Sequence, residues 1–324
     1  MESVATVMGP VETADLGTTL MHEHVFVLTP DMLANYPAGW DEELRVADAA
    51  AKLTRLKQLG VDTIVDPTVV GLGRYIPRIQ RINQLVDINI VAATGVYTYN
   101  DVPFPFHFVG PGTPFDGDEP MIDLFVRDIT EGIAGTAVRA AFLKCAIDAP
   151  GLTPGVERVM RAVAQAHLRT GVPITVHTSA NNQGGTTTQG LLADEGVDLT
   201  RVVLGHCGDS ADIGYLEGLA DCGSLLGMDR FGLDALLPLE QRIDTVVHLC
   251  RDGYADRMVL SQDASCYIDW FPDGVMAQVA PNWHYEHIVR DVLPALRERG
   301  VTEHQITTML VDNPRRYFEQ AGTY

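Results

Sequence analysis

The chain alternates between short apolar runs and longer segments whose apolar residues recur at helical spacing. Eight runs have the length of a strand and no apolar–polar alternation, which is typical of a parallel sheet buried on both faces. They lie at residues 18–25, 62–66, 88–94, 140–147, 173–177, 201–205, 224–228 and 258–260. A single (β/α)8 TIM barrel over residues 1–324 accounts for all eight units without a domain linker. A doubly wound sheet is the alternative, but no G-x-G-x-x-G follows the first strand.

Helical spacing of apolar residues occupies most of the segments between the expected strands. The expected helices lie at residues 41–59, 74–86, 121–133, 154–170, 187–193, 211–220, 238–250, 285–299 and 302–310. Thr153 and Pro154 predict the start of one of them, as N-cap and first helical residue. Residues 102–115, rich in proline and phenylalanine, show neither period and are expected to form a long loop.

The balance of charge limits the partners of the protein. Lys and Arg number 23 and Asp and Glu number 43, which gives a net charge of −20. Such a surface repels phosphate backbones and anionic membranes. We therefore expect a neutral or metal-bound small molecule as the partner, and neither a nucleic-acid nor a membrane partner.

The cysteines and the N-terminus bear on the compartment. Five cysteines, without a C-x-x-C pair, predict buried reduced thiols rather than a disulfide framework. Residues 1–10 lack the basic start and apolar core of a signal peptide. Apolar runs stay well short of the ~18 residues that a membrane helix requires. These features predict a cytoplasmic protein.

Two histidines, His22 and His24, lie two residues apart at the end of the first expected strand. Side chains at this spacing point to the same face of a strand. Two neutral imidazoles on one face could hold a divalent metal ion. The alternative is a pair of histidines that donate hydrogen bonds to nearby loops, and the motif alone does not choose between the two.

Further polar residues lie within or at the ends of later apolar runs, namely Lys144, His177, His206 and Asp263. Because a barrel forms its active site at the carboxyl ends of its strands, we expect these residues to meet His22 in one site. Each has a structural alternative: His206 could cap a loop, and Asp263 could be the N-cap of a helix.

Lys144 stands in the middle of the apolar run 140–147, Ala-Ala-Phe-Leu-Lys-Cys-Ala-Ile. Burial of an ammonium group without a partner is costly, so it lowers the pKa of the lysine. A neutral amine can react with carbon dioxide to give a carbamate, an anionic ligand that can bridge two metal ions. The alternative is a lysine that extends out of the barrel end toward water.

These residues, with the stretches ADLGTTLMHEH, FLKCAIDAPGLTPGVERV, GHCGDS, GMDRFG and VDNPRR, resemble the phosphotriesterase-like lactonases of the amidohydrolase superfamily. The resemblance covers nearly the whole chain. It implies two divalent metal ions, zinc in first place and cobalt, iron or manganese as alternatives. His22, His24 and Asp263 would hold the more buried ion, and His177 and His206 the more exposed one. Carboxylated Lys144 and a hydroxide would bridge them.

The resemblance also implies roles around the metal ions. Tyr97 would reach the bridging oxygen or the substrate, Arg230 would border the substrate pocket, and Asp263 would accept a proton. For Tyr97 the alternative is simple packing on a loop. For Arg230 it is an ion pair with Asp229 or Asp234.

The implied activity is the opening of lactones, in particular N-acyl-homoserine lactones in quorum quenching, with promiscuous phosphotriesterase activity. A homodimer is implied as well. Two alternatives stay open: an amide or imide hydrolase or deaminase, and a catalytically weak barrel that acts as a binding module. Ser179 and Gln262 depart from the residues usual in the family, which bears on substrate preference and rate rather than on the metal ligands.

Overall fold

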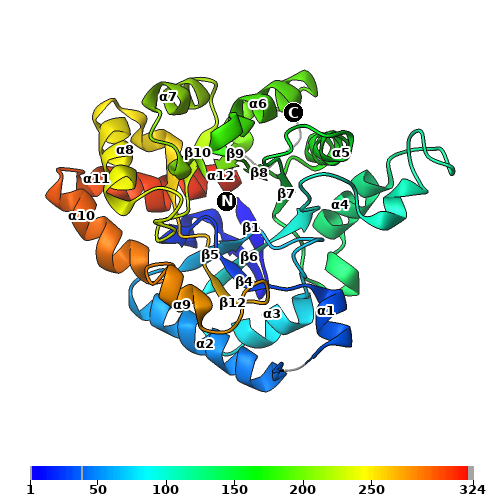
Figure 1. Ribbon diagram of the computed structural model, residues 1–324, viewed down its shortest axis with the longest axis horizontal. Helices are drawn as coiled ribbons and strands as arrows, with labels where there is room; N and C mark the ends of the chain where they lie inside the picture. The colour runs from blue at the N-terminus through cyan, green and yellow to red at the C-terminus, as the bar shows by residue number, and fades with distance from the viewer. Residues whose placement is uncertain (1, 38, 320–324) are drawn as a thin grey trace.

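Eight short parallel strands form the centre of the molecule (Figure 1). They are β3 (Thr19–Leu20), β5 (Thr63–Asp66), β6 (Asn89–Gly95), β7 (Phe142–Ala146), β8 (Ile174–His177), β9 (Val202–Gly205), β10 (Leu225–Met228) and β11 (Met258–Leu260). Neighbours in the sheet follow the chain order from β3 to β11, and every pairing is parallel. The N–H of Met21 approaches the carbonyl of Leu260 at 3.5 Å, which brings the two edge strands together. The sheet is thus a nearly closed barrel, and the predicted (β/α)8 fold is confirmed.

Helices surround this barrel in the computed structural model, which describes residues 2–37 and 39–319. They are α2 (Glu42–Gln58), α3 (Ile76–Asn83), α4 (Pro120–Thr130), α5 (Pro154–Thr170), α6 (Gly184–Asp194), α7 (Ile213–Asp221), α8 (Leu239–Arg251) and α10 (Leu293–Glu298). The start of α5 matches its prediction, because Thr153 accepts a hydrogen bond from the N–H of Val156 and Pro154 follows. Gly171, with φ 74°, ends this helix in the left-handed conformation.

Alternate residues of the strands belong to different parts of the core. Val65, Val91 and Val259 belong to one cluster of buried side chains that fills the barrel. Their chain neighbours, such as Ile64 and Ile90, belong to a larger cluster between the strands and the helices. Because both faces are buried, the strands carry apolar residues at successive positions, which explains the pattern in the sequence.

The first expected strand is divided in the structure. β3 ends at Leu20, and a second strand, β4 (His24–Val27), pairs in parallel with β12 (Ser265–Ile268). His22 therefore lies in the short link between two strands rather than inside one, and that part of the prediction was wrong. The cause is a tertiary contact, because β4 pairs with β12 in a separate two-stranded sheet rather than with the strands of the barrel.

Several short elements were not predicted. β1 (Ser3–Thr6) and β2 (Gly9–Glu12) form an antiparallel hairpin. The others are the helices α1 (Pro30–Asn35) and α9 (Val275–Val279). The loop expected at residues 102–115 is confirmed, with one short 3-10 turn, η2 (Phe104–His107), inside it.

The two C-terminal helices expected from the sequence are interrupted by wide turns. The first consists of the π-helix η8 (Ile288–Val292) and then α10, which has Pro294 near its start. The second runs from α11 (Glu303–Thr307) through the π-helix η9 (Thr308–Asp312) to α12 (Asn313–Glu319), which has Pro314 near its start. Proline removes one backbone donor and clashes with the carbonyl four residues earlier, and a π turn accommodates both effects.

All five cysteines are free, as predicted, but not all are buried. Cys222 is exposed at the end of α7, which corrects the expectation of five buried thiols. Among the described residues, the structure contains no helix with the length and apolar character needed to cross a membrane.

Candidate active site

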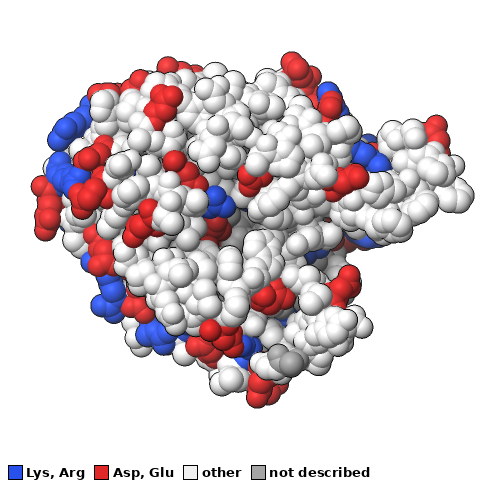
Figure 2. All heavy atoms as spheres, in the orientation of Figure 1, with Lys and Arg blue, Asp and Glu red and all other residues white. Residues whose placement is uncertain are grey.

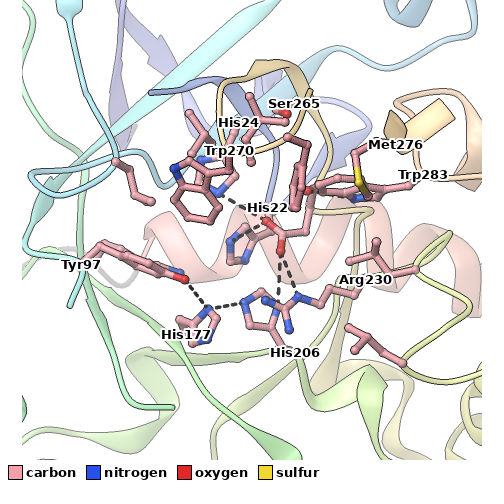
Figure 3. Close-up of a pocket in the computed structure, with 18 of the residues that line it drawn as sticks. His22, His24, Tyr97, His177, His206, Arg230, Ser265, Trp270, Met276 and Trp283 are labelled. Atoms are coloured by element: carbon pink, nitrogen blue, oxygen red, sulfur yellow. Dashed lines mark hydrogen bonds and ion pairs between the residues drawn. The ribbon is translucent and has the colours of Figure 1, made fainter. Parts of the chain in front are cut away.

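A cavity with an empty volume of about 780 Å³ lies at the carboxyl ends of the strands. Its lining includes every residue that the sequence marked for the site: His22, His24, Tyr97, Lys144, His177, His206, Arg230 and Asp263 (Figure 3). The space-filling view shows a hollow near the centre of the face that it presents, among scattered acidic side chains (Figure 2). Residues that are up to about 240 positions apart in the chain are thus brought into one site.

One group of ligand atoms gathers at Asp263. The Nε2 atoms of His22 and His24 lie 3.5 and 3.3 Å from Oδ1 of this carboxylate. The three residues form a group whose ligand atoms could hold one metal ion. Burial alone would raise the pKa of Asp263, but nearby histidines and Arg230 hold it well below its ordinary value. The carboxylate is therefore ionised, as a metal ligand must be.

A second pair of ligand atoms faces the same cavity. Nδ1 of His177 lies 2.8 Å from Nε2 of His206. Burial lowers the pKa of His177 to about 4, and it lowers the pKa of His206 well below its ordinary value. Both imidazoles are thus neutral at pH 7, which is the form that binds a metal ion.

Lys144 is 1% exposed, and its Nζ atom has no hydrogen-bond partner among the described residues. Burial lowers the pKa of its amine to about 8, although the carboxylates of Asp263 and Asp229 act in the opposite direction. A buried nitrogen without a partner is unfavourable, so the site fits an additional group at this atom. The alternative in which Lys144 extends to water is wrong, because the side chain is buried.

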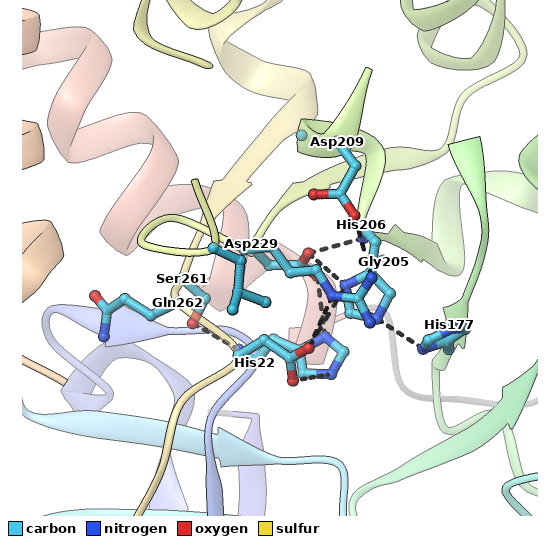
Figure 4. Close-up of polar contacts among 12 residues, drawn as sticks. His22, His177, Gly205, His206, Asp209, Asp229, Ser261 and Gln262 are labelled. Carbon is cyan, nitrogen blue, oxygen red and sulfur yellow. Dashed lines mark hydrogen bonds and ion pairs between the residues drawn. The ribbon is translucent and has the colours of Figure 1, made fainter. Parts of the chain in front are cut away.

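Carboxylates behind the histidines fix the orientation of the rings. Asp229 lies 3.0 Å from Nδ1 of His22 through one oxygen and 2.9 Å from Nδ1 of His206 through the other (Figure 4). Asp148 lies 2.7 Å from Nε2 of His177. Each contact directs the opposite ring nitrogen into the cavity, as outer carboxylates do in metal sites.

Asp148 and Asp229 were not predicted as site residues, although a signal exists for both. Asp148 follows β7 by two residues and Asp229 directly follows β10, so both lie at the carboxyl ends of strands. Asp229 was considered only as a partner for Arg230. Arg230 instead contacts Asp263 and Asp209, at 3.0 and 3.1 Å.

Tyr97 borders the cavity beside His177. Its hydroxyl lies 3.4 Å from Nδ1 of His177 and forms a short hydrogen bond with the hydroxyl of Tyr99, a residue that the sequence did not single out. Burial raises the pKa of Tyr97, so the phenol keeps its proton. The alternative of mere packing on a loop does not describe this contact with the site.

Apolar side chains form the outer wall of the cavity. They are Val27, Leu72, Leu233, Leu236, Ile268, Trp270, Phe271, Met276 and Trp283. Several come from residues 265–283, which comprise β12 and most of the segment between it and η8. The cavity therefore combines a polar floor with an apolar wall, which suits a ligand with one reactive polar group and an apolar body.

Neither residue that departs from the family pattern is part of the cavity lining. Gln262 is fully buried and directs its amide to Glu23, to the carbonyl of Tyr285 and to the N–H of Ile288. Ser179 precedes the 3-10 turn η4 (Ala180–Asn182). Any influence of these two residues on substrate choice has to pass through their neighbours.

A parallel barrel with histidines, a carboxylate and a buried lysine at the carboxyl ends of its strands defines a metal-dependent hydrolase. The sequence profile of the phosphotriesterase family matches residues 2–318, and the chain belongs to this family.

Individual relatives agree with this assignment. The chain is 60% identical over 325 residues to the "Phosphotriesterase homology protein" of Mycobacterium tuberculosis, with both chains covered in full. It is 40% identical over 310 residues to the "Aryldialkylphosphatase" of Saccharolobus solfataricus, which covers 95% of this chain and 96% of the relative. The solved structure of the phosphotriesterase from M. tuberculosis superimposes with a TM-score of 0.98, covering 99% of this chain and 100% of the other.

Proposed function

We propose that this metal-dependent hydrolase opens lactones, with N-acyl-homoserine lactones as its substrate class and slower promiscuous action on phosphotriesters. The observation that carries the proposal is the cavity itself, where ligand atoms of five side chains meet beneath an apolar wall. They are joined there by a lysine amine that has no hydrogen-bond partner in the described part of the chain. A small lactone ring could reach the polar floor while its acyl chain contacts the wall. The net charge of −20 over the whole chain favours a neutral substrate over a polyanion.

We propose two divalent ions as cofactors, with zinc first and cobalt, iron or manganese as alternatives. His22, His24 and Asp263 would hold one ion, and His177 and His206 the other. Lys144, as a carbamate, would join the two. This assignment is supported by the donor chemistry of nitrogen and oxygen atoms, which suits all four metals. It is also supported by the buried Nζ of Lys144, which forms no hydrogen bond with residues 2–37 or 39–319.

Two bound divalent ions supply a strong oxygen nucleophile at neutral pH and polarise the oxygen of the scissile group. The residues of the chain then carry out the remaining tasks. Tyr97 donates its phenolic hydrogen toward the substrate oxygen, since its raised pKa keeps it protonated. Asp263 accepts a proton, and Arg230, which lies 3.0 Å from it, holds the carboxylate in place.

Phosphotriester hydrolysis is the second candidate for the main activity. It is supported by the relative named "Aryldialkylphosphatase", which is 40% identical over almost the whole chain. The metal-binding residues serve both reactions, so the apolar wall has to decide which substrate binds better.

A substrate panel tests the proposal. Zinc-loaded protein would be given N-acyl-homoserine lactones of several chain lengths, aryl phosphotriesters and N-acyl amides, and kcat/KM would be measured for each. We expect the highest kcat/KM for a lactone. A higher value for phosphotriesters or for amides would make the protein a phosphotriesterase or an amide hydrolase. Metal binding without turnover of any class would favour a binding module.

We further propose that residues 1–324 act as one domain and that the protein is a cytoplasmic homodimer. One sheet that takes strands from residue 19 to residue 260 supports the first point. Free cysteines support the cytoplasmic location. Exposed aromatic side chains in the loop at 102–115, among them Phe104 and Phe115, support the homodimer. Light scattering coupled to size exclusion would measure the mass of the particle.

A further inference from the structure

Glu23 lies between two metal-binding histidines in sequence, yet its side chain is no part of the cavity lining. It is fully buried, with 0% exposure. Its carboxylate reaches the turn that follows β11. Oε1 accepts hydrogen bonds from the hydroxyl of Ser261 at 2.7 Å, from the backbone N–H of Gln262 at 2.8 Å and from the amide of the same residue at 3.2 Å. Oε2 accepts from the N–H of Ala264 at 3.0 Å.

The residue inside this turn is Asp263, whose backbone has φ 56°. For a residue with a Cβ atom this left-handed conformation costs about 1–2 kcal/mol, so neighbouring interactions must hold it. Glu23 binds the N–H groups on both sides of Asp263, those of Gln262 and Ala264. In addition, the N–H of Asp263 donates to the carbonyl of His22 at 3.0 Å.

The same contacts connect the three ligands of the first metal position. The N–H of His22 donates to the hydroxyl of Ser261, which in turn donates to Glu23. The N–H of His24 donates to the carbonyl of Ala264 at 2.8 Å. The side chain of Glu23 is thus the shared acceptor of a network that fixes the distance between the histidine strand and the aspartate turn.

We propose that Glu23 is a positioning residue that holds the Asp263 turn and thereby sets the metal affinity of the group formed by His22, His24 and Asp263. This inference rests on the proposed function, because it assumes that the group binds a metal ion. A carboxylate is required rather than an amide, since both oxygens accept hydrogen bonds. Glutamine in this place would direct its NH2 group toward donors, either the N–H of Ala264 or the hydroxyl of Ser261 and the N–H of Gln262.

Outer residues of this kind change metal affinity by roughly 10- to 100-fold when they are replaced. We expect Glu23→Gln to weaken binding of one of the two ions by about that factor and to leave the other ion, at His177 and His206, nearly unchanged. Glu23→Asp keeps two acceptor oxygens and should recover part of the loss. Ser261→Ala, which removes only one of the donors, should show a smaller effect in the same direction.

Asp128→Asn serves as the matched control. Asp128 is also a buried carboxylate, 4% exposed, and it accepts hydrogen bonds from Arg74 and Thr94 away from the metal ligands. We expect this variant to lower the Tm while it keeps both metal ions. A general loss of stability would therefore appear in both variants, whereas selective loss of one ion would appear only in Glu23→Gln.

The experiment measures Zn²⁺ and Co²⁺ binding to metal-free protein by competition with a chromophoric chelator, with stoichiometry from native mass spectrometry and Tm from calorimetry. Two ions in the wild type and one weakened ion in Glu23→Gln support the inference. Two ions at unchanged affinity in Glu23→Gln overturn it, as does equal metal loss in Asp128→Asn. If Glu23→Gln does not fold, unchanged affinities in Ser261→Ala overturn it. A wild type that binds no metal ion would refute the proposed function itself, and this outcome is distinct from the others.

Discussion

The amine of Lys144 is buried and has no hydrogen-bond partner among the described residues. We expect Lys144→Ala to lower metal content and to abolish turnover, since the proposed carbamate ligand is lost. Short carboxylic acids should partly restore activity by occupying the vacated space. Elemental analysis and lactone hydrolysis, with and without added propionate, would measure this.

Lys52→Ala is the control for that experiment. Lys52 is half-buried and donates to the carbonyl of Cys266, outside the group of metal ligands. The Lys52→Ala variant should keep its metal ions, and its activity should not respond to propionate. Full metal occupancy and full activity in Lys144→Ala would contradict the assignment of a bridging lysine.

Tyr97 offers a test of the substrate chemistry as distinct from metal binding. If its hydroxyl stabilises charge that develops only in the transition state, Tyr97→Phe lowers kcat and kcat/KM together. A loss of ~10² to 10³ is the scale for one well-placed donor. Steady-state kinetics and metal analysis would be run in parallel, with Tyr99→Phe as the comparison from the same wall. Near-complete retention of rate, or loss of metal in Tyr97→Phe, would be incompatible with the role.

The residues proposed to bind metal could be grouped from sequence because each lies within or close to an apolar strand, and parallel strands present their carboxyl ends together. The residues that contact these side chains or the turns that carry them could not be predicted in the same way. Asp229 follows β10 but contacts His22, about 200 positions earlier, and His206, which directly follows the preceding strand β9. Glu23 was visible in the His-x-His motif, but its partners lie beyond residue 260. Such roles depend on which segments meet in space, and strand periodicity carries no information on that.

Among the elements, the loop from β10 to α8 shapes the cavity and depends on one buried arginine. Arg242 is 1% exposed. It donates to the carbonyls of Gly208, Leu233 and Leu237 and to the carboxylate of Asp209. Asp209 in turn contacts Arg230. Arg242 therefore supports both the loop and, through Asp209, the side chain of Arg230, which contacts Asp263.

Arg242→Met should therefore destabilise the protein by roughly 3–5 kcal/mol, the scale for breaking a buried ion pair. Because Leu233 and Leu236 of this loop line the cavity, KM for long-chain lactones should rise more than KM for short ones. Urea denaturation and a chain-length series would measure both effects. Arg299→Met, which removes a surface arginine paired with Glu240, should change neither; an equal effect of the two substitutions would contradict this role.

Elements with clear end signals were predicted well, and those that depend on tertiary partners were not. The ends of α5 follow from Thr153, Pro154 and Gly171, which act locally. β12 is four residues long and only partly buried, and its strand conformation depends on pairing with β4. The π turn before Pro294 lies inside the expected helix 285–299, so the sequence pattern shows no break there, whereas the expected helix 302–310 ends before α12.

At the scale of the whole molecule, the histidines predict loss of stability in acid. Burial lowers the pKa of His22, His167, His177 and His206, that of His177 to about 4. Unfolded histidines titrate near 6.5, so below that pH the unfolded chain binds more protons than the folded one. The stability that these residues contribute is therefore present above about pH 6.5 and is lost as the pH falls toward 4.

Calorimetry on metal-free protein between pH 7.5 and 5 would test this expectation, and we expect the Tm to fall steadily toward the acid end. His167→Gln, far from the metal ligands, should flatten the dependence, whereas substitution of the exposed His248 should leave it unchanged. A Tm that stays constant or rises toward pH 5 would show that the buried histidines are not the cause.

The barrel as a whole could be inferred because eight buried strands with intervening helices have few other solutions. The shape of the cavity could not, since its wall comes largely from residues 265–283 and from the loop before α8. These segments lack a period, and their conformation is set by individual contacts such as those of Arg242.

One contact in that wall connects a tryptophan to the backbone beside the first proposed metal position, so tryptophan fluorescence is expected to report on metal binding. The indole N–H of Trp283 donates to the backbone carbonyls of Gln262 and Asp263, at 2.9 and 3.0 Å. Filling of the first metal position should therefore alter the environment of this indole and change tryptophan fluorescence during a Zn²⁺ titration. Trp283→Phe should remove most of the signal, while replacement of Trp40, which packs against Phe26, should preserve it. If so, metal loading can be followed by emission in unlabelled protein, and if the signal survives in Trp283→Phe, it originates elsewhere.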